Sequence, residues 1–335
     1  MSKPLVLLLG GDSLVGRDFR DRFSDTGVAA RLELTAAGEG VSAVIAATSS
    51  DEDDDPEVIP ALDEEQIAAA KVIVFAGQPE EARAGYELIQ KYQGLVAVVD
   101  LTGELEGTAE VRVRAPFLES VPPANEFVHV VPHPAAYMLA HFLTQLNEAQ
   151  PLKRAIATVF EPASASGRKA IGELQKQAIS LLTFKPVPKD IFGEQLAFNL
   201  LARPSEESTI GWAGREKRIE RHLASLLAID GKVPMPSVRL VQAPVFHGYS
   251  ISLWVEFASS VKTAAILEHL REEGADIRGE DLDAPNNVGM SGESGYAIGA
   301  VEVDRNDSRA CWFWLAGDNH RIAADVAVEV VTELV

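Results

Sequence analysis

Hydrophobic runs and amphipathic stretches alternate through the first third of the chain. Leu5–Leu9 is a continuous apolar run, the pattern of a parallel strand that is covered on both faces. Further strands are predicted at 31–36, 71–77 and 95–103, with an additional apolar run at 42–50, a charge-rich loop at 51–57, and helices at 14–26 and 80–92. This alternation predicts an α/β fold with a Rossmann-type, doubly wound parallel sheet.

The pattern changes near residue 130, where strands and helices no longer alternate regularly. Helices are predicted at 136–149, 167–182, 214–227 (a charged one), 262–274 and 320–334, and strands at 153–164, within 238–257, and as an antiparallel pair at 296–304 and 310–318. This mixture predicts an α+β second domain. The predicted domains are therefore 1–130, a dinucleotide-binding type; 131–317, the α+β domain; and 318–335, a helix that returns to the first domain.

The residues after the first strand form a candidate phosphate-binding turn. Gly10 and Gly11 allow a sharp turn, and Gly16 allows the following helix to approach the strand closely. Such a turn can hold a dinucleotide pyrophosphate on backbone N–H groups at the helix N-terminus. The spacing departs from Gly-x-Gly-x-x-Gly because Ser13 stands at the middle position, and Asp12 adds a negative charge. The candidate cofactor-binding residues are Gly10, Gly11, Ser13, Leu14, Val15 and Gly16.

The composition limits the kinds of partner that the protein can bind and the cellular compartment in which it is expected. The formal net charge is −20, which argues against nucleic acid and anionic membranes as partners. The single cysteine, Cys311, excludes an internal disulfide framework and fits a cytoplasmic protein. The first 30 residues lack the profile of a signal peptide, and no apolar run approaches the roughly 20 residues that a membrane span needs.

Seven segments, in order, resemble motifs of the aspartate-semialdehyde dehydrogenase family. They are GGDSLVG (10–16), KVIVFAG (71–77), VAVVDLTGEL (96–105), FEPASASGRKAIGELQKQ (160–177), AFN (197–199), QAPVFHGYS (242–250) and WFWLAGDNHRIAADVAVEVV (312–331). The resemblance implies a Rossmann-type domain and a dimerisation domain that carries the chemistry. In this family NADPH reduces an aspartyl phosphate to the semialdehyde; a cysteine thiolate attacks the acyl carbon, a histidine acts as acid and base, and an arginine binds the substrate carboxylate.

This sequence departs from the family pattern at the positions that carry the chemistry. Alignment with the family's Asn-Pro-x-Cys motif places Ala136 at the nucleophile, and alanine cannot form a thioester. Glu161 replaces a glutamine, Gln242 the substrate arginine, and Tyr249 the histidine base; tyrosine titrates near pH ~10 and is a poor base at neutrality. Glu106 stands near another family arginine. The stretch 35–40 also lacks the arginine of the family's NADP phosphate clamp, which disfavours NADP but leaves both NAD and NADP open.

Several side chains could have a functional role, although each of them also has an ordinary structural interpretation. Glu161, His247 and Tyr249 could form a new acid–base set, and His129, His133 and His141 could converge on a metal, although no metal site is expected. Glu33 could meet a ribose hydroxyl or be an exposed strand carboxylate. The SASG turn (164–167) and the loop 285–295 could bind an anion, or be a capped helix start and a surface loop. Cys311, in an aromatic strand, is expected to be a small buried hydrophobe rather than a substitute nucleophile.

These observations predict a divergent, non-catalytic homologue of the family. It would be a homodimeric binding or regulatory protein, with no certain cofactor and a weakened NAD(P) pocket. The alternative is an NAD(P)-dependent oxidoreductase of altered mechanism, without a covalent intermediate. A third hypothesis is a partner subunit for an active paralogue. The sequence identifies neither a ligand nor a pathway.

Overall fold

The chain forms two compact units. A computed structural model describes residues 3–36, 43–45, 57–109, 111–119, 127–203, 205–279 and 282–335. One unit comprises Met1–Pro132 together with Ala323–Val335, and the other comprises His133–Ile322. The last helix, α8 (Asn319–Leu334), therefore begins in the second unit and contributes most of its length to the first.

The first unit contains a six-stranded sheet with the strand order β2-β1-β5-β6-β8-β7. The strands are β1 (Leu5–Leu9), β2 (Arg31–Thr35), β5 (Ala70–Phe75), β6 (Ala97–Asp100), β7 (Val111–Val113) and β8 (Val128–Val130). Every neighbouring pair is parallel. All five residues of β1 are buried, as expected for a strand covered on both faces. The predicted Rossmann-type parallel sheet is confirmed.

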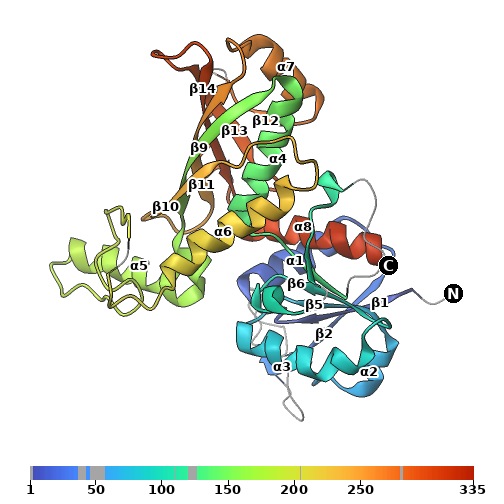
Figure 1. Cartoon of the computed structure of the whole chain (residues 1–335). Coiled ribbons are helices and arrows are strands. Elements are labelled where there is room, and N and C mark those ends of the chain that lie inside the picture. The colour runs from blue at the N-terminus through green and yellow to red at the C-terminus, as the bar shows by residue number, and fades with distance from the viewer. Residues whose placement is uncertain are drawn as a thin grey trace. The chain divides into compact units, whose positions relative to one another are not determined.

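Helices lie on both faces of this sheet (Figure 1). The helix α1 (Leu14–Asp25) and α8 lie on one face, and α2 (Glu64–Ala69) and α3 (Pro79–Ile89) on the other. Gly85 lets α3 approach β5, because a Cβ atom there would lie 2.7 Å from the Phe75 ring. Short 3-10 helices occur at Gln90–Tyr92, Glu104–Gly107 and Pro116–Leu118.

The sequence did not predict several short elements of this unit. They are α2, β7 and β8, and the antiparallel pair of β3 (Ala43–Ile45) and β4 (Glu57–Ile59), which forms a separate two-stranded sheet. Within the predicted apolar run 42–50 only 43–45 are described, and the charge-rich stretch 51–57 lies outside the described residues apart from position 57. Runs of three residues are too short to show a period.

The second unit contains a mixed six-stranded sheet with the order β10-β9-β11-β14-β13-β12. The strands are β9 (Leu152–Glu161), β10 (Ser237–Gln242), β11 (Tyr249–Phe257), β12 (Asp276–Ile277), β13 (Ala297–Val303) and β14 (Ala310–Gly317). The predicted antiparallel pair is confirmed by β13 and β14. β10 and β11 are not paired with each other, because β9 lies between them, parallel to β10 and antiparallel to β11.

Helices complete the second unit as an α+β arrangement. They are α4 (Pro134–Ala149), α5 (Gly167–Leu182), α6 (Trp212–Leu227) and α7 (Thr263–Glu272), with a 3-10 turn at Ala163–Ser166. Phe142 of α4 meets Phe313 of β14 edge-on, with ring centroids 5.1 Å apart, which anchors α4 on the sheet. No helix of the described residues is long and apolar enough to cross a membrane.

Candidate functional site

The glycines of the turn after β1 are required by the packing of the chain itself. Gly10 has φ +76°, and a Cβ atom there would lie 2.1 Å from the Cα of Gly77. A Cβ atom on Gly16 would lie 2.2 Å from the carbonyl oxygen of Gly10. On Gly11 it would lie 2.7 Å from the Leu34 side chain. These glycines are therefore explained without a bound nucleotide.

Ser13 caps the helix that follows this turn. Its hydroxyl oxygen accepts the N–H of Gly16 at 2.8 Å, and the hydroxyl donates to the carbonyl of Ala76 at 2.6 Å. Leu14 and Val15 open α1. A phosphate at this helix end would compete with the serine for the Gly16 N–H group. Asp12 is exposed in the same turn and adds a negative charge.

Ala136 lies in the first turn of α4, where the resemblance predicts the nucleophile. Its side chain is fully buried. His133 caps this helix: its Nδ1 accepts the N–H of Ala135 at 3.3 Å, and Pro134 follows as the first helical residue. The start of α4 therefore presents an imidazole and a methyl group at a position where a thiolate would act in the family.

A hydrogen-bonded network lies beside this helix start, and its centre is the phenol of Tyr249. The Tyr249 oxygen lies 3.2 Å from Nε2 of His133 and 3.3 Å from Oε1 of Glu161. Nη1 of Arg215 lies 3.0 Å from the same Oε1. Tyr249 and Glu161 are each 1% exposed. We refer to His133, Glu161, Arg215 and Tyr249 as the Tyr249 network.

The direction of each proton in the Tyr249 network follows from the donors around it. Because Nδ1 of His133 accepts a backbone N–H, the neutral ring carries its proton on Nε2. That N–H donates to the Tyr249 oxygen, and the Tyr249 hydroxyl donates to Glu161. Arg215 donates to the same carboxyl oxygen. The phenol is thus hydrogen-bonded both to the imidazole of His133 and to the carboxyl group of Glu161.

Burial moves the pKa values of His133 and Tyr249 away from neutral pH. Burial, with the charges of Arg218, His222 and Arg215, lowers the pKa of His133 well below its usual value. Burial and the nearby Glu161 carboxyl raise the pKa of Tyr249 well above 10. Burial also raises the pKa of Glu161, against the opposing charge of Arg215. His133 is therefore neutral and Tyr249 protonated at neutral pH.

Gln242, at the position of the family arginine, is buried beside Glu161. Its Nε2 donates to the backbone carbonyl of Glu161 at 2.8 Å. Its Oε1 and the Oε2 of Glu161 are buried atoms that have no hydrogen-bond partner among the described residues. Protonation of the carboxyl group at Oε2 converts that oxygen from an acceptor to a donor, and the raised pKa of Glu161 favours it.

The sequence analysis missed two helix α6 residues that complete this region. Arg215 pairs with Glu161, and Nδ1 of His222 accepts the N–H of His133 at 2.8 Å. Arg215, Arg218 and His222 follow the spacing i, i+3 and i+7, which places them on one face of a helix. This spacing is the one signal of the group in the sequence, and it becomes informative only once Glu161 is known to be buried.

The other histidines predicted as candidates are dispersed. His129 lies 3.0 Å from the Arg114 guanidinium, and His141 accepts from or donates to the Tyr296 hydroxyl at 2.9 Å. Burial lowers the pKa of His141 to about 4. His247 lies edge-on to His320, whereas the imidazole that contacts Tyr249 is that of His133. In the part of the chain that the structure describes, no three His, Cys, Asp or Glu side chains form a metal-binding group.

Cys311 lacks the features of a reactive thiol. It lies on β14, is fully buried, and burial raises its pKa to about 12. Because the thiolate is the reactive form, this thiol is inert at neutral pH. The interpretation of Cys311 as a small buried hydrophobe is confirmed.

The remaining candidates have local structural contacts. Ser164 of the SASG turn donates to Asn319, and Asn287 of the loop 285–295 accepts from Ser250. Glu33 pairs with Arg31 on the same strand. Glu106 lies in the 3-10 helix Glu104–Gly107. In the stretch 35–40, where the phosphate clamp was considered, residues 37–40 lie outside the described residues.

Comparison with known proteins places this geometry in context. The family model described as semialdehyde dehydrogenase, dimerisation domain, matches residues 143–322. A protein of Azotobacter vinelandii named USG-1 protein homolog is 31% identical over 242 residues, which cover 71% of each chain. The aspartate-semialdehyde dehydrogenase of Rickettsia bellii is 28% identical over 208 residues, and the match spans 61% of that enzyme and of this chain.

Solved structures share the whole fold. The crystal structure of aspartate semialdehyde dehydrogenase II from Vibrio cholerae, complexed with ASA, superposes with a TM-score of 0.82. The match covers 100% of this chain and 98% of that chain, at 19% sequence identity. At this identity the likeness concerns the fold and not the chemistry.

Proposed function

The chain belongs to the semialdehyde dehydrogenase family, and we propose that it is a non-catalytic member that acts as a binding or regulatory protein. The proposal rests on the alanine at position 136, where the resemblance places the nucleophile, and on the Tyr249 phenol, which hydrogen bonds to both His133 and Glu161. A methyl group cannot attack an acyl phosphate. Tyr249, at the family's base position, holds its proton and hydrogen bonds to His133 and Glu161.

The polarity of this region supports the same proposal. The family substrate is an anion, and an arginine fork is suited to bind its carboxylate. Here Gln242 stands at that position with a neutral amide in place of the fork, and its buried Oε1 is an acceptor, which does not bind a carboxylate. Arg215 supplies a cation, but it is paired with Glu161. An aspartyl phosphate is therefore a poor ligand for this site.

We propose that any dinucleotide binds weakly at the turn of Gly10, Gly11, Ser13, Leu14, Val15 and Gly16. Support comes from the Ser13 hydroxyl, which already accepts the N–H of Gly16, and from the exposed carboxylate of Asp12. The helix end keeps its favourable dipole, so weak binding remains compatible with the turn. NAD is favoured over NADP, since a 2′-phosphate adds negative charge next to acidic side chains.

Purified protein is expected to show no turnover of aspartate semialdehyde with phosphate and NAD⁺ or NADP⁺. Loss of a covalent nucleophile alone lowers rates by several orders of magnitude. The measurement is the absorbance of reduced cofactor, with an active aspartate-semialdehyde dehydrogenase as positive control. Calorimetric titration with the four dinucleotides accompanies it, and Asp12→Ser is expected to tighten any binding.

The outcomes separate the two functional hypotheses. Turnover at about 1 s⁻¹ or faster, an ordinary enzymatic rate, contradicts the non-catalytic assignment. Micromolar dinucleotide binding together with slow reduction of an aldehyde favours the alternative, an oxidoreductase without a covalent intermediate. In that case Tyr249→Phe is expected to abolish the reaction, because it removes the hydroxyl that joins His133 to Glu161.

We propose that the protein is a homodimer that associates through the sheet of the second unit. The matching family model describes a dimerisation domain over the same residues. Ile156, Trp254 and Trp312 are cross-strand neighbours on β9, β11 and β14, so their side chains share one face of the sheet. Ile156 is 50% exposed and Trp312 43% exposed. A row of large apolar side chains on a surface is typical of an interface.

Ile156→Asp is expected to convert the dimer into monomers, because it places a charge in this apolar row beside Trp254. Analytical ultracentrifugation measures the mass. The control is Val288→Asp, since Val288 is 88% exposed in a loop of the same unit, and this variant is expected to stay dimeric. If Ile156→Asp sediments like the wild type, the sheet face is not the interface.

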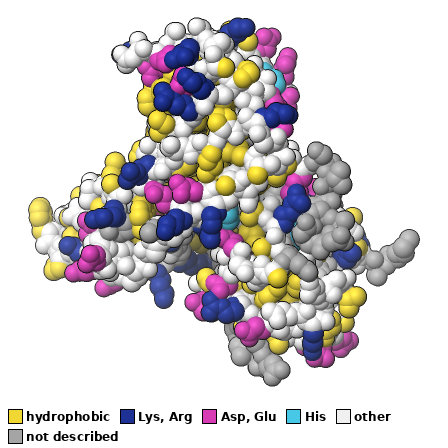
Figure 2. All heavy atoms as spheres, viewed as in Figure 1, with side chains coloured by type: hydrophobic (Ala, Val, Ile, Leu, Met, Phe, Trp, Pro, Cys, Tyr) yellow, Lys and Arg dark blue, Asp and Glu magenta, His cyan; other side chains and the backbone are white. Residues whose placement is uncertain are grey.

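We propose a small molecule, and not nucleic acid or a membrane, as the partner beyond the second copy. Acidic and basic side chains are interspersed on the face drawn in Figure 2, and the net charge is −20. Phosphate backbones and anionic lipids are repelled by such a charge. A cytoplasmic location is part of this proposal and rests on the single cysteine.

A further inference from the structure

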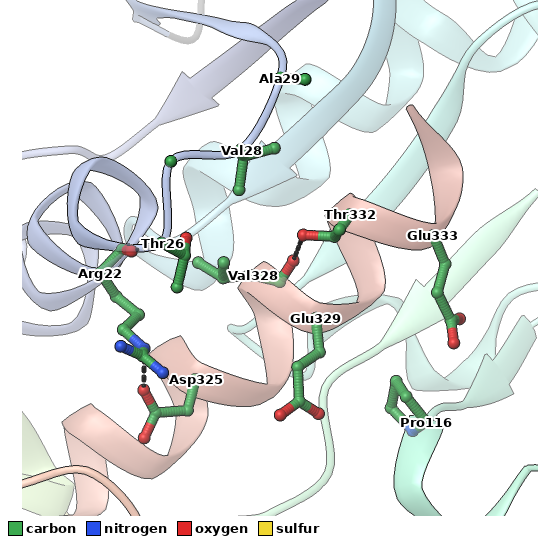
Figure 3. Close-up of a pocket in the computed structure, with 11 residues that line it drawn as sticks. Arg22, Thr26, Val28, Ala29, Pro116, Asp325, Val328, Glu329, Thr332 and Glu333 are labelled. Carbon is green, nitrogen blue, oxygen red and sulfur yellow. Dashed lines mark hydrogen bonds and ion pairs between the residues drawn. The ribbon is translucent and has the colours of Figure 1, made fainter.

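A cavity of about 510 Å³ lies within the first unit, between the end of α1 and helix α8 (Figure 3). Its lining includes Arg22 and Thr26 of α1 and the turn after it, Pro116, and one face of α8. Small-molecule pockets of proteins have volumes of roughly 300–1,000 Å³. The cavity therefore has the size of a ligand site, and its lining includes neither the glycine turn nor the Tyr249 network.

The polar groups of this cavity are mostly hydrogen-bond acceptors. The hydroxyl of Thr26 donates to the carbonyl of Arg22 at 2.9 Å, and that of Thr332 donates to the carbonyl of Val328 at 2.7 Å. Their protons are thus used within their own helices, and their oxygens remain as acceptors. A complementary ligand must supply hydrogen-bond donors.

Three carboxylates of α8 line the cavity, and they differ in their partners. Asp325 forms an ion pair with Arg22, with 2.7 Å between Oδ1 and Nε, and Glu333 forms one with Arg114. Glu329 lies between them along the helix (Figure 3), and the described residues give it neither an ion pair nor a hydrogen bond. Glu329, which is exposed to solvent, is therefore the carboxylate of the three that has no direct partner among the described residues.

The surroundings of Glu329 favour a cation. Desolvation raises its pKa, and the neighbouring charges of Asp325 and Glu333 raise it further, against the opposing charge of Arg22. A bound positive charge would relieve this repulsion. The rest of the lining includes apolar groups, among them Val28, Val328 and Pro116, which suit the hydrocarbon part of a ligand.

We propose that this cavity binds a small organic cation, a primary alkylamine whose ammonium group pairs with Glu329. A bare metal ion is disfavoured, because no three acidic, histidine or cysteine side chains among the described residues are close enough to share one. The ammonium group donates to the Glu329 carboxylate, and the alkyl chain contacts the apolar wall. The assignment does not depend on whether the protein is catalytic.

The test is an NMR-detected titration of the full-length protein with hexylamine at physiological ionic strength, with hexanol as the uncharged probe. Hexylamine is expected to bind at one saturable site, and hexanol is expected to bind at least about tenfold more weakly, since a charge-assisted hydrogen bond is lost. Glu329→Gln is expected to reduce hexylamine affinity by at least about tenfold for the same reason.

Two further variants separate a specific site from general attraction to an acidic protein. Glu268→Gln removes one exposed carboxylate of α7 and is expected to leave hexylamine binding unchanged. Ala29→Phe keeps Glu329 but fills the exposed edge of the cavity, and it is expected to weaken binding. Equal affinities of Glu329→Gln and Glu268→Gln, or equal binding of hexylamine and hexanol, would overturn the assignment. So would the lack of any saturable binding in the wild type.

Discussion

Arg114→Leu is expected to lower the free energy of unfolding by about 3–5 kcal/mol, the usual effect of breaking a buried ion pair by removing one partner. The Arg114 side chain is 0% exposed, and its Nε lies 2.7 Å from Oε2 of Glu119, whose side chain is 1% exposed. Its guanidinium also contacts His129 and Glu333. Removing the guanidinium takes the nearer cation from the buried Glu119 carboxylate and leaves Arg112, 3.7 Å away, beside it. Urea denaturation monitored by circular dichroism measures the loss.

The neighbouring arginine provides the control for this prediction. Arg112 lies 3.7 Å from Glu119, but its side chain is 38% exposed. Arg112→Leu is expected to cost within about 1 kcal/mol, the range of surface ion pairs. The double variant Arg114→Leu with Glu119→Leu is expected to recover part of the loss, because no unpaired buried charge remains. Similar effects of the two single variants would mean that the burial of Arg114 has no energetic consequence.

The parallel sheet of the first unit could be predicted because its central strands are long apolar runs. Leu5–Leu9 is buried at every position, so its composition alone indicates a strand covered on both faces. β7 and β8 have three residues each, and β12 has two. Such strands carry no period, and their pairing is decided by neighbours that are distant in the sequence.

The sequence predicted which residues belong to the candidate site, but it did not predict which of them contact each other. The order of motifs identified Ala136, Glu161 and Tyr249 as members of one region. The partners that complete it come from far along the chain, since 116 residues separate His133 from Tyr249 and 54 separate Glu161 from Arg215. A single sequence records no such pairing. It records only the helical spacing of basic residues on α6, which becomes meaningful once Glu161 is known to be buried.

Arg215→Met is expected to destabilise the protein by about 3 kcal/mol at pH 7, near the lower end of the range for buried pairs because Arg215 is 24% exposed. Arg215 is the cation on the Glu161 carboxyl group, and methionine keeps the length of the side chain without its charge. Arg221→Met, at an exposed position of the same helix, is the control and is expected to have a small effect. Denaturant midpoints measure both variants.

The pH dependence of this loss distinguishes a structural network from a ligand site. The folded pKa of Glu161 is already raised by burial, and removal of Arg215 raises it further. The folded state then binds the proton more tightly than the unfolded chain, whose glutamate titrates near pH ~4.3. Stability is therefore retained below that pH and lost as the pH rises through the folded pKa of Glu161. Consequently, the destabilisation caused by Arg215→Met is expected to shrink on acidification.

Adding Glu161→Gln to Arg215→Met should abolish this pH dependence, because a neutral amide replaces the titrating group. If Arg215→Met instead left stability unchanged at every pH and altered only the binding of a dinucleotide or aldehyde, Arg215 would be a ligand-binding residue. The Tyr249 network would then be available to take part in a reaction with a bound ligand. An oxidoreductase of altered mechanism would become the better hypothesis. The stability measurement thus tests whether the region around Ala136 is a self-contained buried network.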